Sequence, residues 1–291
     1  MNNILTDRFY DFITLRLLML ANKTEKLHIT FPVFCYNLRI ENIFRQTDRT
    51  SMFLQDHEDF KIPQNVALFT ILNSPKNWLL CRNSDYYTIA EFVLNEKPRF
   101  HSAYIINGVK KYLINGSNME DKIIDICDNL NDKTLEDIHV EFISVPGIGN
   151  FMAHQIIINL QLRGHLQYSD SYVKLGPGSK KGLKLLELKE KESSLTELLS
   201  EIKENELIQS LTPKAVINGY KECTWTLETV ENCLCIFQKM IKAMETNKCR
   251  RKYSNINTST APYIPQKAYV FENIQNIVQM LPDSLKLEIN I

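Results

Sequence analysis

The stretch Val145-Pro146-Gly147-Ile148-Gly149-Asn150-Phe151-Met152-Ala153 decides the expected fold, because two glycines stand between two helical apolar patterns. Pro146 can end the first helix, and the glycines permit a tight turn into the second. Apolar residues on both sides then pack the two helices together. The unpaired backbone N–H groups at the start of the second helix suit a nucleic-acid phosphate. An ordinary helix–turn–helix corner explains the same pattern, so both interpretations stay open.

Apolar residues recur with helical spacing outward from this stretch, which predicts an all-α fold with at most a minor β-hairpin. Residues 195–202, for example, form an amphipathic stripe of leucine and isoleucine. Alternation with period two is limited to Tyr104–Ile106 and Val140–Ile143, the two short strand candidates. The predicted helices span residues 4–22, 37–56, 63–73, 85–95, 119–130, 134–142, 150–162, 180–190, 194–209, 226–246 and 268–280.

Length and composition are those of an ordinary folded protein. The 291 residues carry 34 Lys and Arg against 34 Asp and Glu, and 44% are hydrophobic, which excludes a wholly disordered chain. The best apolar run, Phe12 to Ala21, is interrupted by Arg16 and is too short to span a membrane. The first ten residues show no signal-peptide pattern. We therefore expect an intracellular protein without a membrane partner.

A compositional change near the end divides the chain. Residues 254–266 are rich in Asn, Ser, Thr and Pro, which is typical of a linker. The sequence therefore predicts a helical body over residues 1–253, with a helix–hairpin–helix near 134–163, and a linker with a docking helix over 254–291. Within residues 268–291 an apolar stripe is expected to dock on the body or on a protein partner; it consists of Val270, Ile274, Ile277 and Leu281.

The seven cysteines indicate reduced thiols. They are scattered singly apart from Cys233 and Cys235, and no CxxC pair occurs. A zinc site built from distant cysteines matches no usual ligand spacing. No metal and no cofactor is expected.

The central glycine stretch resembles the helix–hairpin–helix of DNA glycosylases. In those enzymes an aspartate follows the second helix and lies against the flipped nucleotide, and Asp170 stands at a compatible distance here. Such a carboxylate can stabilise developing positive charge or act as a base. A helix N-cap is the alternative for Asp170. Bifunctional glycosylases carry their Schiff-base lysine where this chain has Phe151, so the resemblance argues against lyase chemistry.

A second glycine-rich stretch runs from Gly176 to Leu183. The GxxxxGK[ST] spacing of a P-loop is absent from it. Its Gly176 and Gly178, with Lys180 and Lys181, can cradle a phosphate, although a plain loop before a helix explains them equally.

The stretch Asn42-Ile43-Phe44-Arg45-Gln46-Thr47-Asp48-Arg49 resembles an Asn-x-x-Arg-x-x-Asp-Arg motif of a further family. That family comprises the helical domain of 5-hydroxymethyluracil DNA kinases and the related α-glutamyl/putrescinyl-thymine pyrophosphorylases, also described as amino acid:DNA transferases. Together the matches cover roughly residues 8 to 253. The other matches, in the same order, are Phe69 to Asn73, Pro146 to Gly149 with Phe151 and Ala153, Gly176 to Gly178 with Gly182, Glu231 with Leu234-Cys235, and Lys252-Tyr253.

This resemblance implies a glycosylase-like helical protein that holds a thymine-derived base extruded from DNA. The transferases are thought to replace an activated hydroxymethyl group on that base with an amine. Guanidinium groups bind phosphate bidentately, and Arg45 and Arg49, spaced i, i+4, would share a helix face beside Asp48. A buried ion-pair network is the alternative. The predicted catalytic residues are Asp170, Arg45, Asp48 and Arg49.

Departures from the family pattern favour a second hypothesis. Thr70 stands where the family often has arginine, and Ile236 where it has an acidic residue. In this second hypothesis the chain is a non-catalytic DNA-binding or scaffold subunit of a larger nucleoprotein complex that keeps only the fold. In either case DNA is the expected partner, in the nucleus or wherever the DNA target resides. The predicted nucleic-acid-binding residues are Gly147, Ile148, Gly149, Asn150, Gly176, Gly178, Lys180, Lys181, Arg250 and Arg251.

Overall fold

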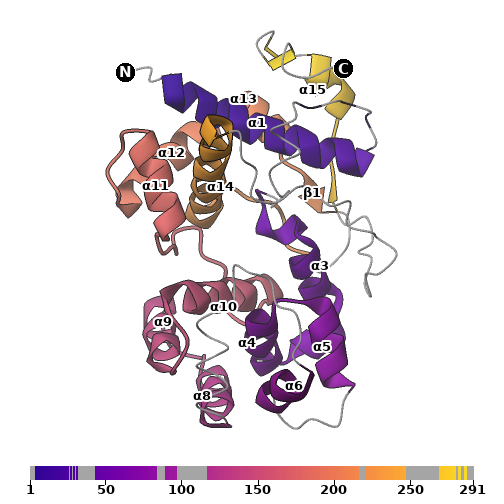
Figure 1. Ribbon diagram of the computed structural model, residues 1–291. Helices are drawn as coiled ribbons and strands as arrows, with labels where there is room; N and C mark the ends of the chain where they lie inside the picture. The colour runs from indigo at the N-terminus through magenta and orange to yellow at the C-terminus, as the bar shows by residue number, and fades with distance from the viewer. Residues whose placement is uncertain are drawn as a thin grey trace. The chain divides into compact units, whose positions relative to one another are not determined.

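The structure is a computed structural model in which helices dominate (Figure 1). It describes residues 4–25, 27, 29, 31, 43–83, 89–96, 117–215, 220–246, 269–279, 281, 282, 285 and 286. Within these residues the strands form one two-stranded antiparallel sheet, so the predicted all-α fold is confirmed. The strand candidate 104–106, the expected linker and Arg250 and Arg251 lie outside the described residues.

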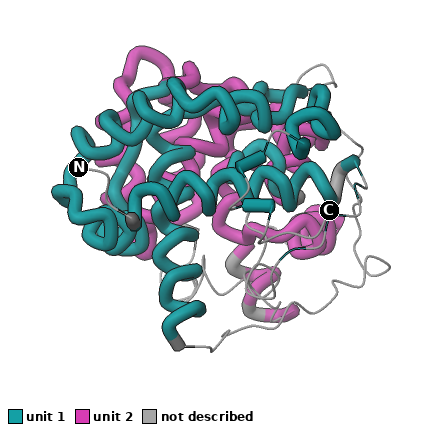
Figure 2. Tube along the Cα trace, turned by 90° about the horizontal axis from the view of Figure 1, so that it is seen from above, with its two compact units in different colours: residues 1–48, 170–259, 266–291 teal, residues 49–169, 260–265 magenta. Residues whose placement is uncertain are grey.

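The chain divides into two compact units (Figure 2). Unit 1 takes residues 1–48, 170–259 and 266–291, and unit 2 takes residues 49–169 and 260–265. Each unit is therefore assembled from separated parts of the sequence. The predicted boundary at residue 253 falls outside the described residues and stays a prediction.

Unit 1 is built around two long helices whose aromatic side chains meet. Phe9 and Phe12 are fully buried, and their ring centroids lie 5.2 and 5.5 Å from that of Phe237. Burial of such rings is the main stabilising contribution to the unit. Its elements are α1 (Ile4–Glu25), η1 (Arg45–Thr47), α11 (Pro177–Leu185), α12 (Glu192–Glu204), α13 (Glu206–Ser210), β1 (Lys214–Ala215), α14 (Leu227–Thr246), β2 (Tyr269–Val270) and α15 (Ile274–Gln279).

The C-terminal segment joins unit 1 through β2. Strand β2 pairs antiparallel with β1, and Lys214 Nζ lies 2.7 Å from Glu272 Oε2. The side chains of Ile274, Ile277 and Leu281 are buried. This apolar stripe therefore docks on the chain's own body, one of the two predicted outcomes. A protein partner for residues 268–291 stays a prediction.

Unit 2 contains the two helices predicted on either side of the central glycines. The motif 145–149 links α9 to α10, as expected, and α9 starts with a capping box formed by Thr134 and Asp137. The strand predicted at Val140–Ile143 is wrong, because these residues belong to α9, whose buried residues follow the helical period. The elements are α3 (Arg49–Asp56), η2 (Glu58–Lys61), α4 (Pro63–Leu72), α5 (Pro75–Arg82), α6 (Ile89–Glu96), α8 (Ser117–Asp128), α9 (Leu135–Ser144) and α10 (Asn150–Arg163).

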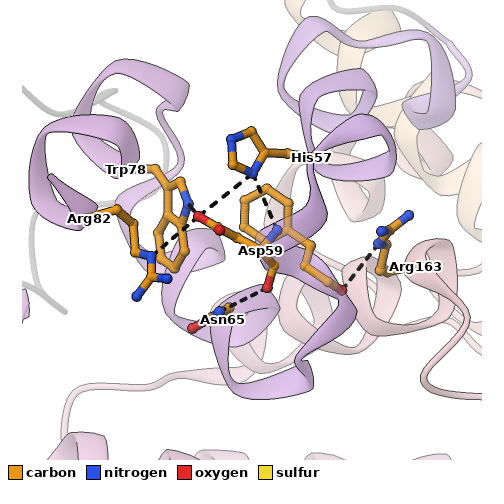
Figure 3. Close-up of polar contacts among 7 residues, drawn as sticks. His57, Asp59, Asn65, Trp78, Arg82 and Arg163 are labelled. Carbon is orange, nitrogen blue, oxygen red and sulfur yellow. Dashed lines mark hydrogen bonds and ion pairs between the residues drawn. The ribbon is translucent and has the colours of Figure 1, made fainter.

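A polar cluster around Asp59 fixes α5 against η2 (Figure 3). Asp59 Oδ2 accepts hydrogen bonds from Trp78 Nε1 at 2.9 Å and from Arg82 Nε at 3.3 Å. The Trp78 ring is buried, and a buried N–H group needs a hydrogen-bond partner, which Asp59 supplies. Helix α5 is not among the predicted helices, although Ser74 as N-cap and Pro75 in the first turn are its start signals.

Candidate functional site

Three glycines let α11 and α14 of unit 1 pack with their backbones close together (Figure 1). A Cβ on Gly182 would lie 2.6 Å from the backbone oxygen of Leu234, and one on Gly178 would lie 2.5 Å from Cys235 Sγ. A larger residue at Gly182 requires a backbone shift, and one at Gly178 requires the Cys235 side chain to move. Close helix packing therefore explains these glycines in the structure, and nucleic-acid binding by Gly176 and Gly178 stays a prediction.

Glu231 of α14 binds the residues at the start of α11. Its Oε1 accepts the backbone N–H of Gly176 at 3.2 Å, and Ser179 also hydrogen-bonds the carboxyl group. A Cβ on Gly176 would approach Glu231 Oε1 to 3.1 Å. The Gly176 amide, expected to face a phosphate, thus donates to a carboxylate of the protein. Burial raises the pKa of Glu231, and these hydrogen bonds act against the rise.

Glu228 lies one helical turn before Glu231 and is half-buried. Its pKa is raised to about 7: burial is the main cause, the charge of Arg45 opposes the rise, and the carboxylates of Glu231 and Asp48 add to it. These four residues form what we call the Arg–carboxylate cluster: Arg45, Asp48, Glu228 and Glu231. A carboxyl group with a pKa near neutrality can both accept and donate a proton in the cell.

Arg45 and Asp48 reach the cluster from a short 3-10 helix. Asp48 donates its N–H to the Arg45 carbonyl at 3.0 Å, and Asn232 of α14 binds the Ile43 carbonyl at 3.0 Å. The predicted helix over residues 37–56 is therefore confirmed from Arg49 to Asp56 and wrong over the described residues 43–48. Asp48 is extended, with φ −70° and ψ 140°, so α3 begins only at Arg49.

Because of this break, Arg45 and Arg49 do not share one helix face, which corrects the predicted pairing. Thr47 lies in the short 3-10 helix, where its hydroxyl donates to the Phe44 carbonyl at 2.8 Å, and the break itself is at the extended Asp48. Arg45 belongs to unit 1 and Arg49 to unit 2. The side chain of Arg49 lies outside the described residues, so its role stays a prediction.

Asp170 lies at the start of the second part of unit 1, and its side chain is exposed. Its backbone carbonyl accepts the N–H of Leu227 at 3.1 Å, one residue before Glu228. The alternative role as a helix N-cap is wrong, because the next helix, α11, starts at Pro177 with Gly176 as its N-cap. Catalysis by Asp170 stays a prediction.

The central hairpin of unit 2 forms as a tight turn. Gly147 has φ 95°, which L side chains rarely adopt, and Gly149 is the N-cap of α10. The Ile148 N–H donates to the Val145 carbonyl at 3.0 Å within the turn. The Asn150 side chain pairs with His139 Nε2 at 3.1 Å and so fastens α10 to α9. Anion binding by this hairpin stays a prediction.

The residues predicted from the sequence do not include Glu228 of the cluster or the nearby Arg16. Glu228 carried a usable signal, because two glutamates spaced i, i+3 on an apolar helix place two carboxylates on one face. Arg16 was read only as the break in an apolar run, yet it is buried in α1, and its charge lowers the pKa of Cys233 against the effect of burial.

The described residues contain neither a metal site nor a membrane-spanning helix. No group of three or more His, Cys, Asp or Glu side chains there is arranged to hold a metal ion. No helix in the same part of the chain is long and apolar enough to cross a membrane.

The pKa of Glu228 predicts a pH dependence of stability. The folded protein keeps the Glu228 proton up to about pH 7, whereas the ordinary value is 4.5, so the free energy of unfolding should fall as the pH rises between these values. For this half-buried carboxyl we expect about 1–3 kcal/mol. Glu228→Gln should flatten the slope in urea unfolding series, and Glu197→Gln, an exposed carboxyl on α12, serves as control. If the free energy of unfolding changed with pH equally in the wild type and in Glu228→Gln, the raised pKa of Glu228 would be contradicted.

Taken together, these observations define an all-α protein in which motifs far apart in the sequence meet at one polar cluster. A family model described as "5-hmdU DNA kinase, helical domain" matches residues 3–249. The chain therefore belongs to this family of DNA-modification proteins. No curated protein and no solved structure matches it.

Proposed function

We propose that this protein binds duplex DNA and holds a modified thymine, of the 5-hydroxymethyluracil type, extruded from the helix at the Arg–carboxylate cluster. The observation that carries the proposal is the meeting of three family motifs in unit 1. Residues 45–48, 176–182 and 228–235 are distant in the sequence, yet their side chains and backbones interact around two carboxyl groups. The protein acts wherever its DNA target resides, in the nucleus or elsewhere.

The chemistry of the cluster suits an oxidised thymine. Such a base offers ring carbonyl oxygens, an N–H and a hydroxymethyl group. The Arg45 guanidinium donates to carbonyl oxygens, while a carboxylate accepts from the N–H or the hydroxyl. A site built to hydrogen-bond a hydroxyl discriminates strongly against the analogue that lacks it, because its own polar groups are then left unpaired. Thymine lacks that hydroxyl, so the cluster should favour the modified base.

The same cluster is equipped for a proton transfer. At neutral pH about half of the Glu228 carboxyl groups are ionised, given a pKa of about 7. An ionised Glu228 can take the proton of an amine that replaces an activated hydroxymethyl group, and Arg45 can hold the leaving phosphates. Transfer of an amine to the base is therefore the reaction we assign to an active protein.

A non-catalytic, DNA-binding role is the second candidate, and two buried residues favour it. Thr70, where the family often has arginine, is fully buried and accepts a hydrogen bond from Asn159 at 2.7 Å. Ile236, where the family has an acidic residue, is also buried. Both positions thus support packing in this chain. Equal binding of modified DNA by wild type and Glu228→Gln, without turnover by either, would favour this role.

The lysines of α11 are proposed to bind phosphates of the DNA backbone. Lys180 and Lys181 are exposed on the helix that packs against α14. Charge reversal in Lys180→Glu/Lys181→Glu should weaken binding to any duplex at least about tenfold and lower the salt slope by about 2. Fluorescence anisotropy over a salt series measures both quantities. The control is Lys122→Glu/Lys203→Glu, with exposed lysines on α8 and α12. An equal loss in both double variants would remove α11 from the DNA interface.

A further inference from the structure

The helices that flank the central hairpin expose an unusual amount of apolar surface. The structure describes seven exposed large hydrophobic side chains, and four of them lie between residues 124 and 151. Val140 is 60% exposed and Ile143 is 39% exposed; at spacing i, i+3 they share the outer face of α9. Phe151, in the first turn of α10, is 47% exposed.

These apolar residues lie on the two helices that flank the hairpin, and those helices are fastened to each other. Asn150 pairs with His139 at 3.1 Å, so the residue before Phe151 is bonded to the residue before Val140. Helices α9 and α10 pack directly against each other. We call these apolar residues the hairpin face: Val140, Ile143 and Phe151.

Helices α8 and α9 and the segment between them are strongly acidic. Residues 117–144 contain eight carboxyl side chains and only two lysines. One of the lysines, Lys133, is paired with Glu141 at 2.7 Å. Six of the carboxyl groups are exposed: Asp121, Asp125, Asp128, Asp132, Glu136 and Asp137. A formal charge of −6 on this segment, in a protein whose net charge is zero, repels phosphates and attracts cationic groups.

We propose that the hairpin face binds a basic amphipathic segment of a protein partner. Apolar side chains of that segment cover Val140, Ile143 and Phe151, and its lysines and arginines lie against the carboxylates of α8 and α9. Exposed apolar residues with a charged rim are the usual composition of such an interface. Charge complementarity selects a basic protein segment over DNA, whose phosphates would face the same carboxylates.

A labelled helical peptide of about 16 leucines and lysines in amphipathic order is a suitable probe. The full chain should bind it at about 0.15 M salt, and a leucine/glutamate peptide of the same pattern should not bind. Val140→Ser/Ile143→Ser should weaken binding of the basic peptide at least about tenfold. The matched control is Ile62→Ser/Leu80→Ser, which removes two exposed apolar side chains elsewhere in unit 2 and should change nothing.

Several outcomes would overturn the proposal. They are absence of peptide binding, equal weakening in both double variants, and displacement of the peptide by duplex DNA together with loss of DNA binding in Val140→Ser/Ile143→Ser. The last outcome would identify the hairpin as a DNA contact. Unchanged DNA affinity in this variant supports a separate protein interface and does not depend on the proposed base site.

Discussion

Replacing Gly182 with alanine is expected to destabilise the protein by about 2–4 kcal/mol, the largest loss of stability that we predict for a single methyl group. The added Cβ would lie 2.6 Å from the backbone oxygen of Leu234 and 2.8 Å from its Cβ. Neither atom can rotate away, so α11 and α14 must separate. Because α14 also carries Glu228 and Glu231, we expect DNA binding to fall together with stability. Urea unfolding monitored by circular dichroism measures the first effect.

Gly149→Ala is the matched control for this prediction. A Cβ at Gly149 meets nothing within 4 Å, and its φ of −99° suits any residue. The loss of stability should therefore stay within about 1 kcal/mol, because alanine is a poorer N-cap than glycine. Equal stability of the Gly182→Ala and Gly149→Ala variants would show that the glycine contact between α11 and α14 does not limit packing.

Replacing Arg45 with alanine is expected to give the largest loss of binding. Affinity for a duplex with 5-hydroxymethyluracil should fall about 10- to 100-fold, because a charged hydrogen-bond donor is removed from the base site. Affinity for the thymine duplex should change much less, since the lysines of α11 remain. Anisotropy titrations of both duplexes measure the two effects.

Two controls separate recognition from folding in the Arg45 experiment. Arg8→Ala removes an exposed arginine of the same unit and should leave both affinities unchanged. Arg45→Lys keeps the charge without the guanidinium fork and should recover part of the selectivity. Equal weakening of both duplexes by Arg45→Ala would assign Arg45 to backbone binding or to folding instead of base recognition.

Much of the fold could be predicted because its signals are local. Amphipathic periodicity identified α10, α12 and α14, and the glycines at 147 and 149 located the turn before α10. The failures also have local causes. Residues 140–143 alternate over too few positions to separate a strand from a helix, and apolar periodicity does not register the extended backbone at Asp48 that interrupts the predicted helix.

The candidate site was predicted only in part, because it depends on contacts between distant segments. The motif around Arg45 and the position of Glu231 were visible as family matches. Their meeting, and the inclusion of Glu228, depend on how α14 packs against α11 and on the segment that Asn232 holds. For Gly176 the sequence suggests a phosphate-binding loop. In the structure its backbone N–H instead donates a hydrogen bond to Glu231.

The central claim, that a modified base leaves the helix and enters the Arg–carboxylate cluster, is tested most directly with a fluorescent reporter. A duplex with 2-aminopurine next to 5-hydroxymethyluracil becomes brighter when its neighbour unstacks. At saturating protein, the wild type should raise the fluorescence of this duplex well above that of the matched thymine duplex, and Arg45→Ala should not. Saturated binding without any rise in fluorescence would contradict base extrusion and the site proposed for it.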